Sequence, residues 1–554
     1  MLNTMEIQNA ILQGVFADVI IKIKGDCRLS GTLNLGPNCI LDFDGGTLRP
    51  VSNGANAVIV GYATEIRAPK YHIFYGIELR GTFSNSTLPV EWFGAVGNGF
   101  DGDEAEDNSF LIQSALDSTE NLTNRIPIEL GTAIYNIHST IILKKLNQAI
   151  VGNGCLQILS NIPAIEMRNL YQKVDICEIR YRDYGNTFES MDGTGVLLSG
   201  NVHNATINVD KMTGLKIGFD LSPTPKTPEE TVVGSQYNKI SWQYLECETG
   251  INININNSMN ELQTLWVGEN QFHGGRLYCK KGIIIEGKEG DNDKINGNVF
   301  NCIGFEGWAS GLIMETPIKV KSARLNNFHD LRMSEGIVQT NLTNENGDII
   351  GFESTYIDLE DCECMDFSIK SIMPFNFVKS IRCNNISIRA SVSDKGMGAR
   401  YKGRDTIFIN QTNPNKGAVF SGPIHYSVSS NVIPQNYYQK FEFARSIILN
   451  FDMLFVRDIQ GQVVMSNIVE LEFKTPEYVD DNKTITIDFA NSSYRLHPEM
   501  IICFKGITGS KLVFINSEEA NHSITNNTLT RHGTYKITFN RDENVIIVPL
   551  AYFE

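Results

Sequence analysis

Short apolar runs of Ile, Val and Phe, separated by Asn, Gly and Asp, recur along residues 125–393. Runs of this kind, bounded by turn-forming residues, are typical of β-strands. One motif, Asn-x-Phe, keeps a fixed spacing, because it begins at Asn270, Asn298 and Asn326, at intervals of 28 residues. A β-sandwich does not require equal spacing, whereas a chain that coils repeatedly through the same strands and turns does. The pattern predicts a parallel β-helix in which each Asn satisfies backbone groups at a bend and the Phe residues stack inside.

The stretch 90–116 departs from this strand pattern. It holds an aromatic segment around Trp92 and Phe93, a loop rich in Gly and acidic residues, and then an amphipathic helix. A lone helix at the head of a long β-chain must bury its apolar face, so we expect it to cover the open end of the strand stack. The residues expected on that face are Leu111, Ile112, Ala115 and Leu116, and the possible N-caps are Asp107, Asn108 and Ser109.

Residues 1–50 carry a fainter copy of the same plan. The segment Ile7–Ile11 parallels Ile112–Leu116, and apolar runs and glycine turns then follow in the same order, about 105 to 109 residues earlier in the chain. Internal duplication of this kind points to a solenoid-like architecture. We therefore expect an N-terminal β segment at 1–90 with its own capping helix. A separate globular β-domain is the alternative.

The repeat is lost after about residue 393. Alternating apolar and polar residues, as in Thr484–Phe489 and Lys511–Ile515, are typical of strands with one buried face and suggest antiparallel structure. The expected organisation is thus the N-terminal segment at 1–90, the main β-helix at 91–393 and one or two β-domains at 394–554.

Composition narrows the function. The chain of 554 residues has a formal net charge of −16, which argues against binding nucleic acid through its phosphates. No apolar run approaches the roughly 18 residues of a membrane-spanning helix, so we expect no membrane insertion. Residues 1–6 lack the features of a signal peptide, and the 11 cysteines are therefore expected to be reduced.

No cofactor or metal site is expected from the sequence. The acidic loop 101–107 allows calcium binding as an alternative, because hard cations are bound by clustered oxygen atoms. The loop lacks the full spacing of an EF-hand, however. A solvated loop whose charges favour the N-terminus of the following helix is the main interpretation.

Candidate chemistry appears when the coils are aligned on their Asn residues. Side chains in one column then lie about 4.8 Å apart in adjacent coils, so Glu246 and Glu306 fall two coils apart, roughly 9–10 Å between backbones. Inverting glycosidases hold an acid and a base about 6.5–9.5 Å apart, which makes this pair the candidate catalytic residues. Arginines nearby could hold a sugar carboxylate or stabilise an enolate, and tryptophans could stack on sugar faces. The candidate substrate-binding residues are Trp242, Trp266, His273, Arg276, Trp308, His329 and Arg332.

Strand parity argues against this site. In an unbroken strand, positions two, six and eight after the Asn face the same way, and Phe272 should face inward. Only a turn at Gly274-Gly275, or near Gly304, places the charged side chains at positions six and eight on the outer face of the coils. The alternative is a set of ordinary ladder residues with oppositely charged neighbours, and each Trp can equally be a packing residue.

Two segments resemble a known family. Phe93-Gly94-Ala95-Val96-Gly97-Asn98-Gly99 and Ile112-Gln113-Ser114-Ala115 are similar to the N-terminal motif of the pectate lyase superfamily in phage tailspikes and secreted β-helix proteins. The departure is Asp107-Asn108-Ser109, where the family usually has Asp-Asp-Thr. The resemblance implies an all-β, right-handed parallel β-helix with short capping helices, followed by C-terminal antiparallel β-domains.

The resemblance also implies a function. Such proteins are phage tail components, tailspikes or tail fibres, that bind and depolymerise a bacterial surface or capsular polysaccharide. They are generally homotrimers that assemble in the host cytoplasm with other phage tail proteins, and their C-terminal region promotes trimerisation or receptor binding. A non-catalytic structural tail protein or adhesin on the same scaffold is the alternative. A bacterial polysaccharide lyase or hydrolase is the second alternative, weakened by the missing export signal.

Overall fold

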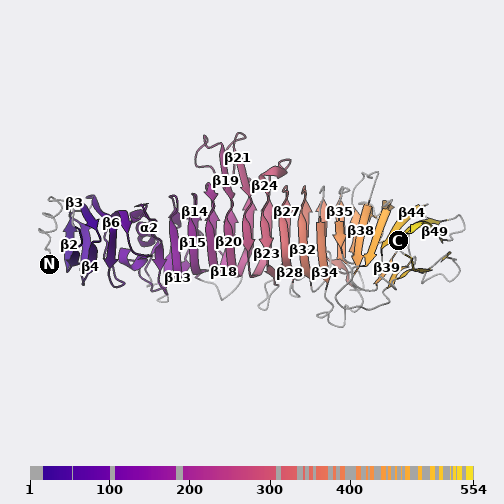
Figure 1. Ribbon diagram of the computed structural model, residues 1–554, viewed down its shortest axis with the longest axis horizontal. Coiled ribbons are helices and arrows are strands. Elements are labelled where there is room, and N and C mark those ends of the chain that lie inside the picture. The colour runs from indigo at the N-terminus through magenta and orange to yellow at the C-terminus, as the bar shows by residue number, and fades with distance from the viewer. Residues whose placement is uncertain are drawn as a thin grey trace. The chain divides into compact units, whose positions relative to one another are not determined.

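The computed structural model describes residues 17–306 except 53, 100–105 and 183–190, residues 314–333, and beyond these mainly the strands named below. Within this part the protein is almost entirely β-structure, and most strand pairs are parallel (Figure 1). The chain divides into two compact units, Met1–Cys279 and Lys280–Glu554. No helix among the described residues is long and apolar enough to span a membrane.

The N-terminal segment of the first unit is built from parallel strands. In β1 every second residue is buried, and Ile20 is in register with Ile40 of the next strand of the sheet. The predicted copy of the main repeat stays a prediction, and the helix expected at Ile7–Ile11 lies outside the described residues. The strands are β1 (Ile20–Ile23), β2 (Asp26–Leu29), β3 (Gly31–Pro37), β4 (Ile40–Phe43), β5 (Thr47–Pro50), β6 (Ala57–Arg67), β7 (Glu78–Phe83) and β9 (Asn121–Leu122).

The main part of the first unit is a ladder of parallel strands, each paired with a strand one turn of chain later. We call each such turn a coil. A buried apolar side chain occupies the same register position in successive coils, as at Ile150, Val174, Ile207, Ile240 and Phe272. The ladder strands are β10 (Ile128–Leu130), β13 (Ala149–Ile158), β15 (Lys173–Tyr181), β18 (Thr206–Leu221), β20 (Lys239–Asn254), β22 (Gln271–His273) and β23 (Arg276–Glu286). Further strands are β11 (Ile134–Ile137), β12 (Ile141–Leu143), β14 (Pro163–Met167) and β16 (Thr194–Leu198), with a small parallel sheet of β17 (Val202–His203), β19 (Val232–Gln236) and β21 (Thr264–Gly268).

The predicted helix is α2 (Ser109–Ser118). Ile112, Ala115 and Leu116 are buried and Leu111 is half-buried, as the spacing predicted. Asn108 is the N-cap residue, but its carboxamide oxygen accepts a hydrogen bond from the Val96 N–H (2.6 Å) and so ties the helix to the preceding loop.

The first coil has its strand edges covered by the predicted junction. Strand β8 (Leu88–Pro89) pairs with β10, and Gly99 donates its N–H to the carbonyl of Ile134 in β11 (2.9 Å). On β12, the side chain of Gln113 accepts from the Ile142 N–H (2.7 Å) and donates to the Ile142 carbonyl (3.1 Å). Since an open strand edge exposes unpaired backbone groups, these contacts explain why the helix precedes the stack.

Buried asparagines line one bend, as the repeat predicted. In the first unit, Nδ2 of Asn238 donates to Oδ1 of Asn270 (2.9 Å). In the second unit, Nδ2 of Asn298 donates to Oδ1 of Asn326 (2.8 Å). All four side chains are fully buried. The amides therefore serve as internal hydrogen-bond partners where the backbone turns and leaves the ladder.

The second unit continues with parallel strands. Phe300, Phe328 and Phe367 are register partners, and their rings stack with centroids 4.6 Å apart at each step. One ladder contains β25 (Val299–Asn301), β26 (Gly304–Phe305), β28 (Asn327–Met333), β32 (Asp366–Ser371), β34 (Ser387–Val392) and β36 (Val419–Ser421). Another contains β27 (Thr316–Lys321), β31 (Ile357–Glu360), β33 (Val378–Ile381), β35 (Ile407–Thr412) and β37 (Ile424–Val428), so parallel pairing continues beyond residue 393.

The C-terminal strands correct part of the antiparallel prediction. Antiparallel pairing is confirmed between β44 (Glu499–Lys505), β48 (Gly533–Phe539) and β49 (Val545–Tyr552). It is wrong for β43 (Thr484–Asp488), which is parallel to both β39 (Ile447–Asn450) and β45 (Lys511–Ile515). Strands β38 (Tyr438–Phe443) and β42 (Ile468–Phe473) are also parallel to each other and to β44. The alternation identified strands with one buried face, but the pairing direction is mixed.

Candidate functional site

A cluster of polar and aromatic side chains lies on the outer face of the first unit, at β20 and the start of β23. Leu245 and Cys247 of β20 are fully buried and point inward. The residues between and before them, Tyr244 and Glu246, therefore point to the opposite face. Tyr278 and Arg276, at the start of β23, complete the group. We call Tyr244, Glu246, Tyr278 and Arg276 the tyrosine–glutamate cluster.

The four side chains form a chain of contacts. The Tyr244 hydroxyl donates to Oε2 of Glu246 (2.8 Å), and the rings of Tyr244 and Tyr278 lie with centroids 4.8 Å apart. Nη1 of Arg276 donates to the Tyr278 hydroxyl (3.1 Å). Burial and the hydrogen bond to Glu246 raise the pKa of Tyr244 well above its ordinary value. The cluster thus brings a carboxylate, two phenol rings and a guanidinium together at one place.

Charged side chains continue this face in the preceding coils. Lys211 is the register neighbour of Tyr244 and pairs with Glu178 (3.0 Å). Thr213 is the register neighbour of Glu246, and Arg180 precedes it in the same column. Nε of Arg180 donates to Oε1 of Gln157 (2.8 Å). The charged groups beside the cluster are thus paired with neighbouring side chains, and Thr213 and Gln157 of this face are buried.

A bend at Gly274-Gly275 resolves the parity problem. Phe272 is buried and Arg276 is exposed, although they are four residues apart and would share a face on a straight strand. A Cβ on Gly274 would lie 2.0 Å from the Trp242 ring, and one on Gly275 would lie 2.0 Å from the Gln243 carbonyl oxygen. Glycine is required here because the chain passes so close to β20. Of the two bends considered in the sequence analysis, the one at Gly274-Gly275 is thus present, and it turns Arg276 outward.

The predicted site residues do not all come together. Glu246 is buried, with 7% of its surface exposed, while Arg276 and His273 are exposed. Trp242 is 4% exposed and its ring lies 5.7 Å from that of Phe219, so it packs inside the stack and offers no free face to a sugar. Trp266 is half-buried in β21 of the small sheet, against Gly234.

The other candidates belong to the second unit. Glu306 follows β26 and is half-buried, and His329 and Arg332 lie in β28, half-buried and exposed respectively. Trp308 lies outside the described residues. The pairing of Glu246 with Glu306 as acid and base remains a prediction. Tyr244 and Tyr278 were not among the predicted site residues, and their hydrogen bonds with Glu246 and Arg276 now add them to the candidate site.

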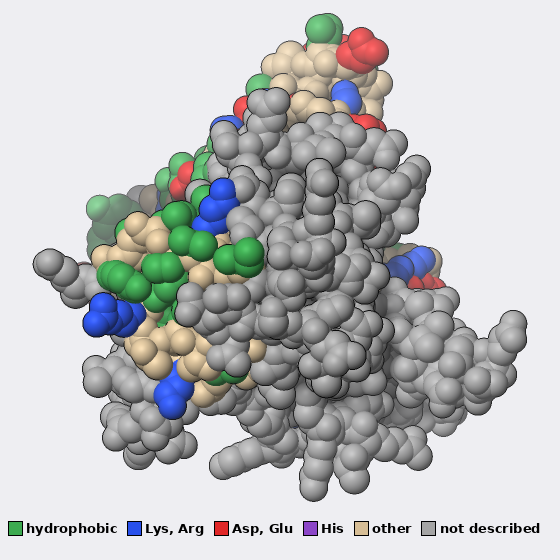
Figure 2. All heavy atoms as spheres, turned by 90° about the vertical axis from the view of Figure 1, so that its right-hand side faces the viewer, with side chains coloured by type: hydrophobic (Ala, Val, Ile, Leu, Met, Phe, Trp, Pro, Cys, Tyr) green, Lys and Arg blue, Asp and Glu red, His purple; other side chains and the backbone are tan. Residues whose placement is uncertain are grey.

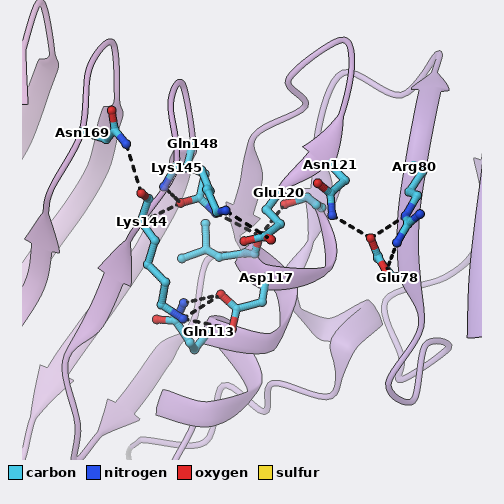
Figure 3. Close-up of polar contacts among 12 residues, drawn as sticks. Glu78, Arg80, Gln113, Asp117, Glu120, Asn121, Lys144, Lys145, Gln148 and Asn169 are labelled. Carbon is cyan, nitrogen blue, oxygen red and sulfur yellow. Dashed lines mark hydrogen bonds and ion pairs between the residues drawn. The ribbon is translucent and has the colours of Figure 1, made fainter. Parts of the chain in front are cut away.

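A groove with a cavity volume of about 520 Å³ lies between α2 and β7, and polar contacts of several of its lining residues are drawn in Figure 3. Its charged side chains are paired with one another: Arg80 with Glu78 (2.6 Å) and Lys144 with Asp117 (3.2 Å). Gln113 also donates to Asp117 (2.8 Å). The ion pair of Lys144 with Asp117 joins α2 to the residue that follows β12, so we interpret it as holding the cap in place. No group of three or more potential metal-ligating side chains occurs within the described residues.

Comparisons with known proteins give two distant structural similarities. No protein-family model matches the chain, and no curated protein matches it significantly. Among solved structures, ORF18 of Geobacillus virus E2 is similar at 12% identity and a TM-score of 0.33, over 84% of this chain and 75% of that one. PfbA, a surface adhesin of Streptococcus pneumoniae, is similar at 11% identity and a TM-score of 0.28, over 83% of this chain and 98% of that one. Neither likeness bears on what this chain binds.

Proposed function

We propose that this protein is a phage tail component, of tailspike or tail-fibre type, that binds and depolymerises a bacterial surface or capsular polysaccharide. The tyrosine–glutamate cluster carries the proposal. Aromatic rings stack on the apolar faces of sugars, a carboxylate can transfer protons at a glycosidic oxygen, and a guanidinium can bind a sugar carboxylate. The capped stack of coils and the motif Phe93–Gly99 with Ile112–Ala115 support the placement in this class.

Glu246 is the proposed proton-transferring residue. Tyr244 would hold the carboxylate through its hydrogen bond, and the Tyr278 ring would stack on a bound sugar beside Arg276. Glu306, which belongs to the second unit, is proposed as a further proton-transferring carboxylate. His273, His329 and Arg332 remain proposed substrate contacts. Because proton transfer by a positioned side chain contributes about 10²–10⁴-fold, loss of Glu246 should be easy to detect.

We infer a right-handed β-helix for the stack of coils. Successive strands of one ladder are parallel and are joined by chain that passes through the other strands of the coil. Crossover connections between parallel strands of one sheet are right-handed in about 98% of cases. The same proposal makes the protein a virion protein that meets other tail proteins during assembly in the host cytoplasm.

We also propose a homotrimer. Exposed apolar residues at the C-terminal strand β49 support a subunit contact there, since Val548, Leu550 and Tyr552 are 44%, 53% and 51% exposed. The face seen in Figure 2 carries hydrophobic side chains beside Lys and Arg on its described residues. Light scattering of the purified protein tests this, and replacement of Leu550 by Lys is expected to lower the measured mass toward that of one chain.

The test of function uses purified capsular and lipopolysaccharide-derived glycans from a panel of bacteria. Binding, new reducing ends and the absorbance of unsaturated uronates are followed for the wild type and for the variants Glu246→Gln, Glu306→Gln and Glu65→Gln. We expect cleavage of at least one glycan, a loss of about 10²-fold or more in Glu246→Gln, and no change in Glu65→Gln, whose carboxylate pairs with Arg67 in β6.

The outcomes separate the alternatives. Reducing ends without unsaturated products indicate a hydrolase, and unsaturated products indicate a lyase. Binding without cleavage indicates a non-catalytic adhesin or structural tail protein. If cleavage occurs and both Glu246→Gln and Glu306→Gln keep full activity, the proposed site is wrong. If no glycan binds, the proposed function is overturned.

A further inference from the structure

One bend of the first unit repeats an unusual backbone conformation in successive coils. The residue two positions before each ladder start has a positive φ, with Tyr171 at 55° and Tyr237 at 57°. The register partners at the ladder starts are Lys173, Thr206, Lys239 and Gln271, so the bend residues two positions earlier also follow one another from coil to coil. We call the set the bend column. Its members are Asn147, Tyr171, Asn204, Tyr237 and Glu269.

The two tyrosines are the unexpected members of the bend column. Asparagine tolerates the left-handed conformation, and the chain uses it at Asn147 and Asn204, whereas a bulky side chain is strained there. Strain of this kind is usually offset by packing, but Tyr171 is 54% exposed and Tyr237 is 51% exposed. The fold therefore needs a bend at these positions but not a tyrosine. Strained residues of this kind cluster at functional sites, which makes binding the next explanation to test.

The spacing of the two rings suits a linear polymer. Tyr171 and Tyr237 lie two coils apart, which corresponds to roughly 9–10 Å along the ladder. Exposed Asn204 lies between them and exposed Glu269 follows in the next coil. Aromatic and hydrogen-bonding groups thus alternate along a line parallel to the stacking direction. An extended polysaccharide offers the matching alternation, because each sugar has an apolar ring face and hydroxyls at its edge.

We propose that Tyr171 and Tyr237 form a second glycan-binding line, separate from the tyrosine–glutamate cluster. The line holds an extended stretch of the polymer. One sugar ring stacks on Tyr171 and another on Tyr237, and the side chain of Asn204 forms a hydrogen bond with the sugar between them. This inference rests on the proposed polysaccharide function. It adds a place where a long chain is retained while a distant part of the same chain reaches Glu246.

The test compares the double variant Tyr171→Asn/Tyr237→Asn with the wild type on a glycan that the wild type binds. Asparagine keeps the bend, as it does at Asn204, so the variant should fold and its melting temperature should rise. Affinity for the polymer is expected to fall at least tenfold, whereas turnover of a short oligosaccharide of the same glycan should stay unchanged. The double variant Tyr171→Phe/Tyr237→Phe should bind almost as the wild type does, since the ring faces remain.

Leu325→Asn is the matched control. Leu325 has the same backbone conformation at a corresponding bend of the second unit, with φ 55°, and is 48% exposed. This variant should gain melting temperature for the same reason and keep full polymer affinity. Tyr62→Asn, at an exposed tyrosine of β6, controls for the loss of a surface aromatic residue.

Three results overturn the inference. Unchanged polymer affinity in the double Asn variant shows that the tyrosines do not bind the glycan. A fall in melting temperature shows that the rings are packing residues. A changed oligomeric mass by light scattering shows that the line is a contact between copies of the chain. If the wild type binds no glycan at all, the proposed function itself fails, which is a distinct result.

Discussion

The hydroxyl of Tyr244 donates a hydrogen bond of 2.8 Å to Oε2 of Glu246, two residues further along the same strand. Both side chains point to the outer face because the intervening Leu245 is fully buried. Glu246 as a residue is nevertheless only 7% exposed, so it is sheltered while it faces outward. This combination distinguishes Glu246 from an ordinary exposed residue of a strand ladder.

Removal of the Tyr244 hydroxyl should change how the free energy of unfolding depends on pH in the alkaline range. Burial and the bond to Glu246 raise the pKa of Tyr244 in the folded state above its unfolded value of about 10. Its contribution to the free energy of unfolding is thus fully present below about pH 10 and is lost as pH rises through the folded-state pKa. Tyr244→Phe should cost about 1 kcal/mol at about pH 8, and the difference from wild type should shrink above about pH 10.

Melting temperatures measured across this pH range check the Tyr244 prediction. Tyr62→Phe, at a residue that is 65% exposed, is the control and should follow the wild type at every pH. A constant difference between Tyr244→Phe and the wild type up to pH 11 or so would contradict the assigned linkage.

The buried side-chain amide of Asn326 is expected to stabilise the folded state through several hydrogen bonds. Its Oδ1 accepts from the backbone N–H (3.1 Å) and Nδ2 (2.8 Å) of Asn298, and its Nδ2 donates to the Ile295 carbonyl (3.2 Å). Asn326→Ala leaves these buried groups unpaired, at about 1–3 kcal/mol for each group. Urea unfolding should show a loss of about 2–5 kcal/mol, whereas exposed Asn257→Ala should change little. A loss below about 1 kcal/mol would show that water replaces the amide.

Substitution of the central residue of the phenylalanine stack, Phe328, should lower the free energy of unfolding. Phe328 is fully buried between Phe300 and Phe367, with ring centroids 4.6 Å away on both sides. Phe328→Ala removes both ring contacts and leaves a cavity, so we expect a loss of about 3–5 kcal/mol in the free energy of unfolding. Phe328→Leu refills most of the volume and should lose clearly less. Equal losses for the two variants would argue against ring stacking as the source of the stability.

The cap can be tested at one side chain. Gln113 bonds both the N–H and the carbonyl of Ile142 on the outer edge of β12. Gln113→Ala should lower stability by about 1–3 kcal/mol and speed hydrogen exchange of the Ile142 amide, since that edge loses its partner. Ser114→Ala, the next residue on α2, is the control. Unchanged exchange at Ile142 would mean that water or the remaining helix covers the edge equally well.

Much of the scaffold follows from local chemistry. Spacing of Asn270, Asn298 and Asn326 by 28 residues predicts stacked coils, because a coil of fixed strand and turn lengths must repeat at a fixed interval. The same spacing predicts that the amides meet and that the phenylalanines stack. Apolar periodicity gives the helix face of α2, since Ile112, Ala115 and Leu116 recur with the helical period. These features depend only on residues close in sequence or on strict periodicity.

Other features depend on how distant segments meet. The alternation in Thr484–Asp488 shows that one face is buried, but it carries no information about the direction of the partner strand, which is parallel. Trp242 and Trp266 have the same side chain, yet one lies in the core and the other in the small sheet, because burial is set by the neighbouring coils.

The candidate site also has some features that the sequence predicts and others that depend on tertiary contacts. The sequence by itself determined that Glu246 and Arg276 belong to aligned columns, and that Gly274-Gly275 could interrupt the strand. Only the tertiary structure decided that the bend exists, because it requires the close approach of β20, where Trp242 and Gln243 leave no room for a side chain. That approach turns Arg276 to the outer face beside Tyr278. The sequence repeat thus predicts which residues are aligned from coil to coil, but packing between the coils decides which face their side chains occupy.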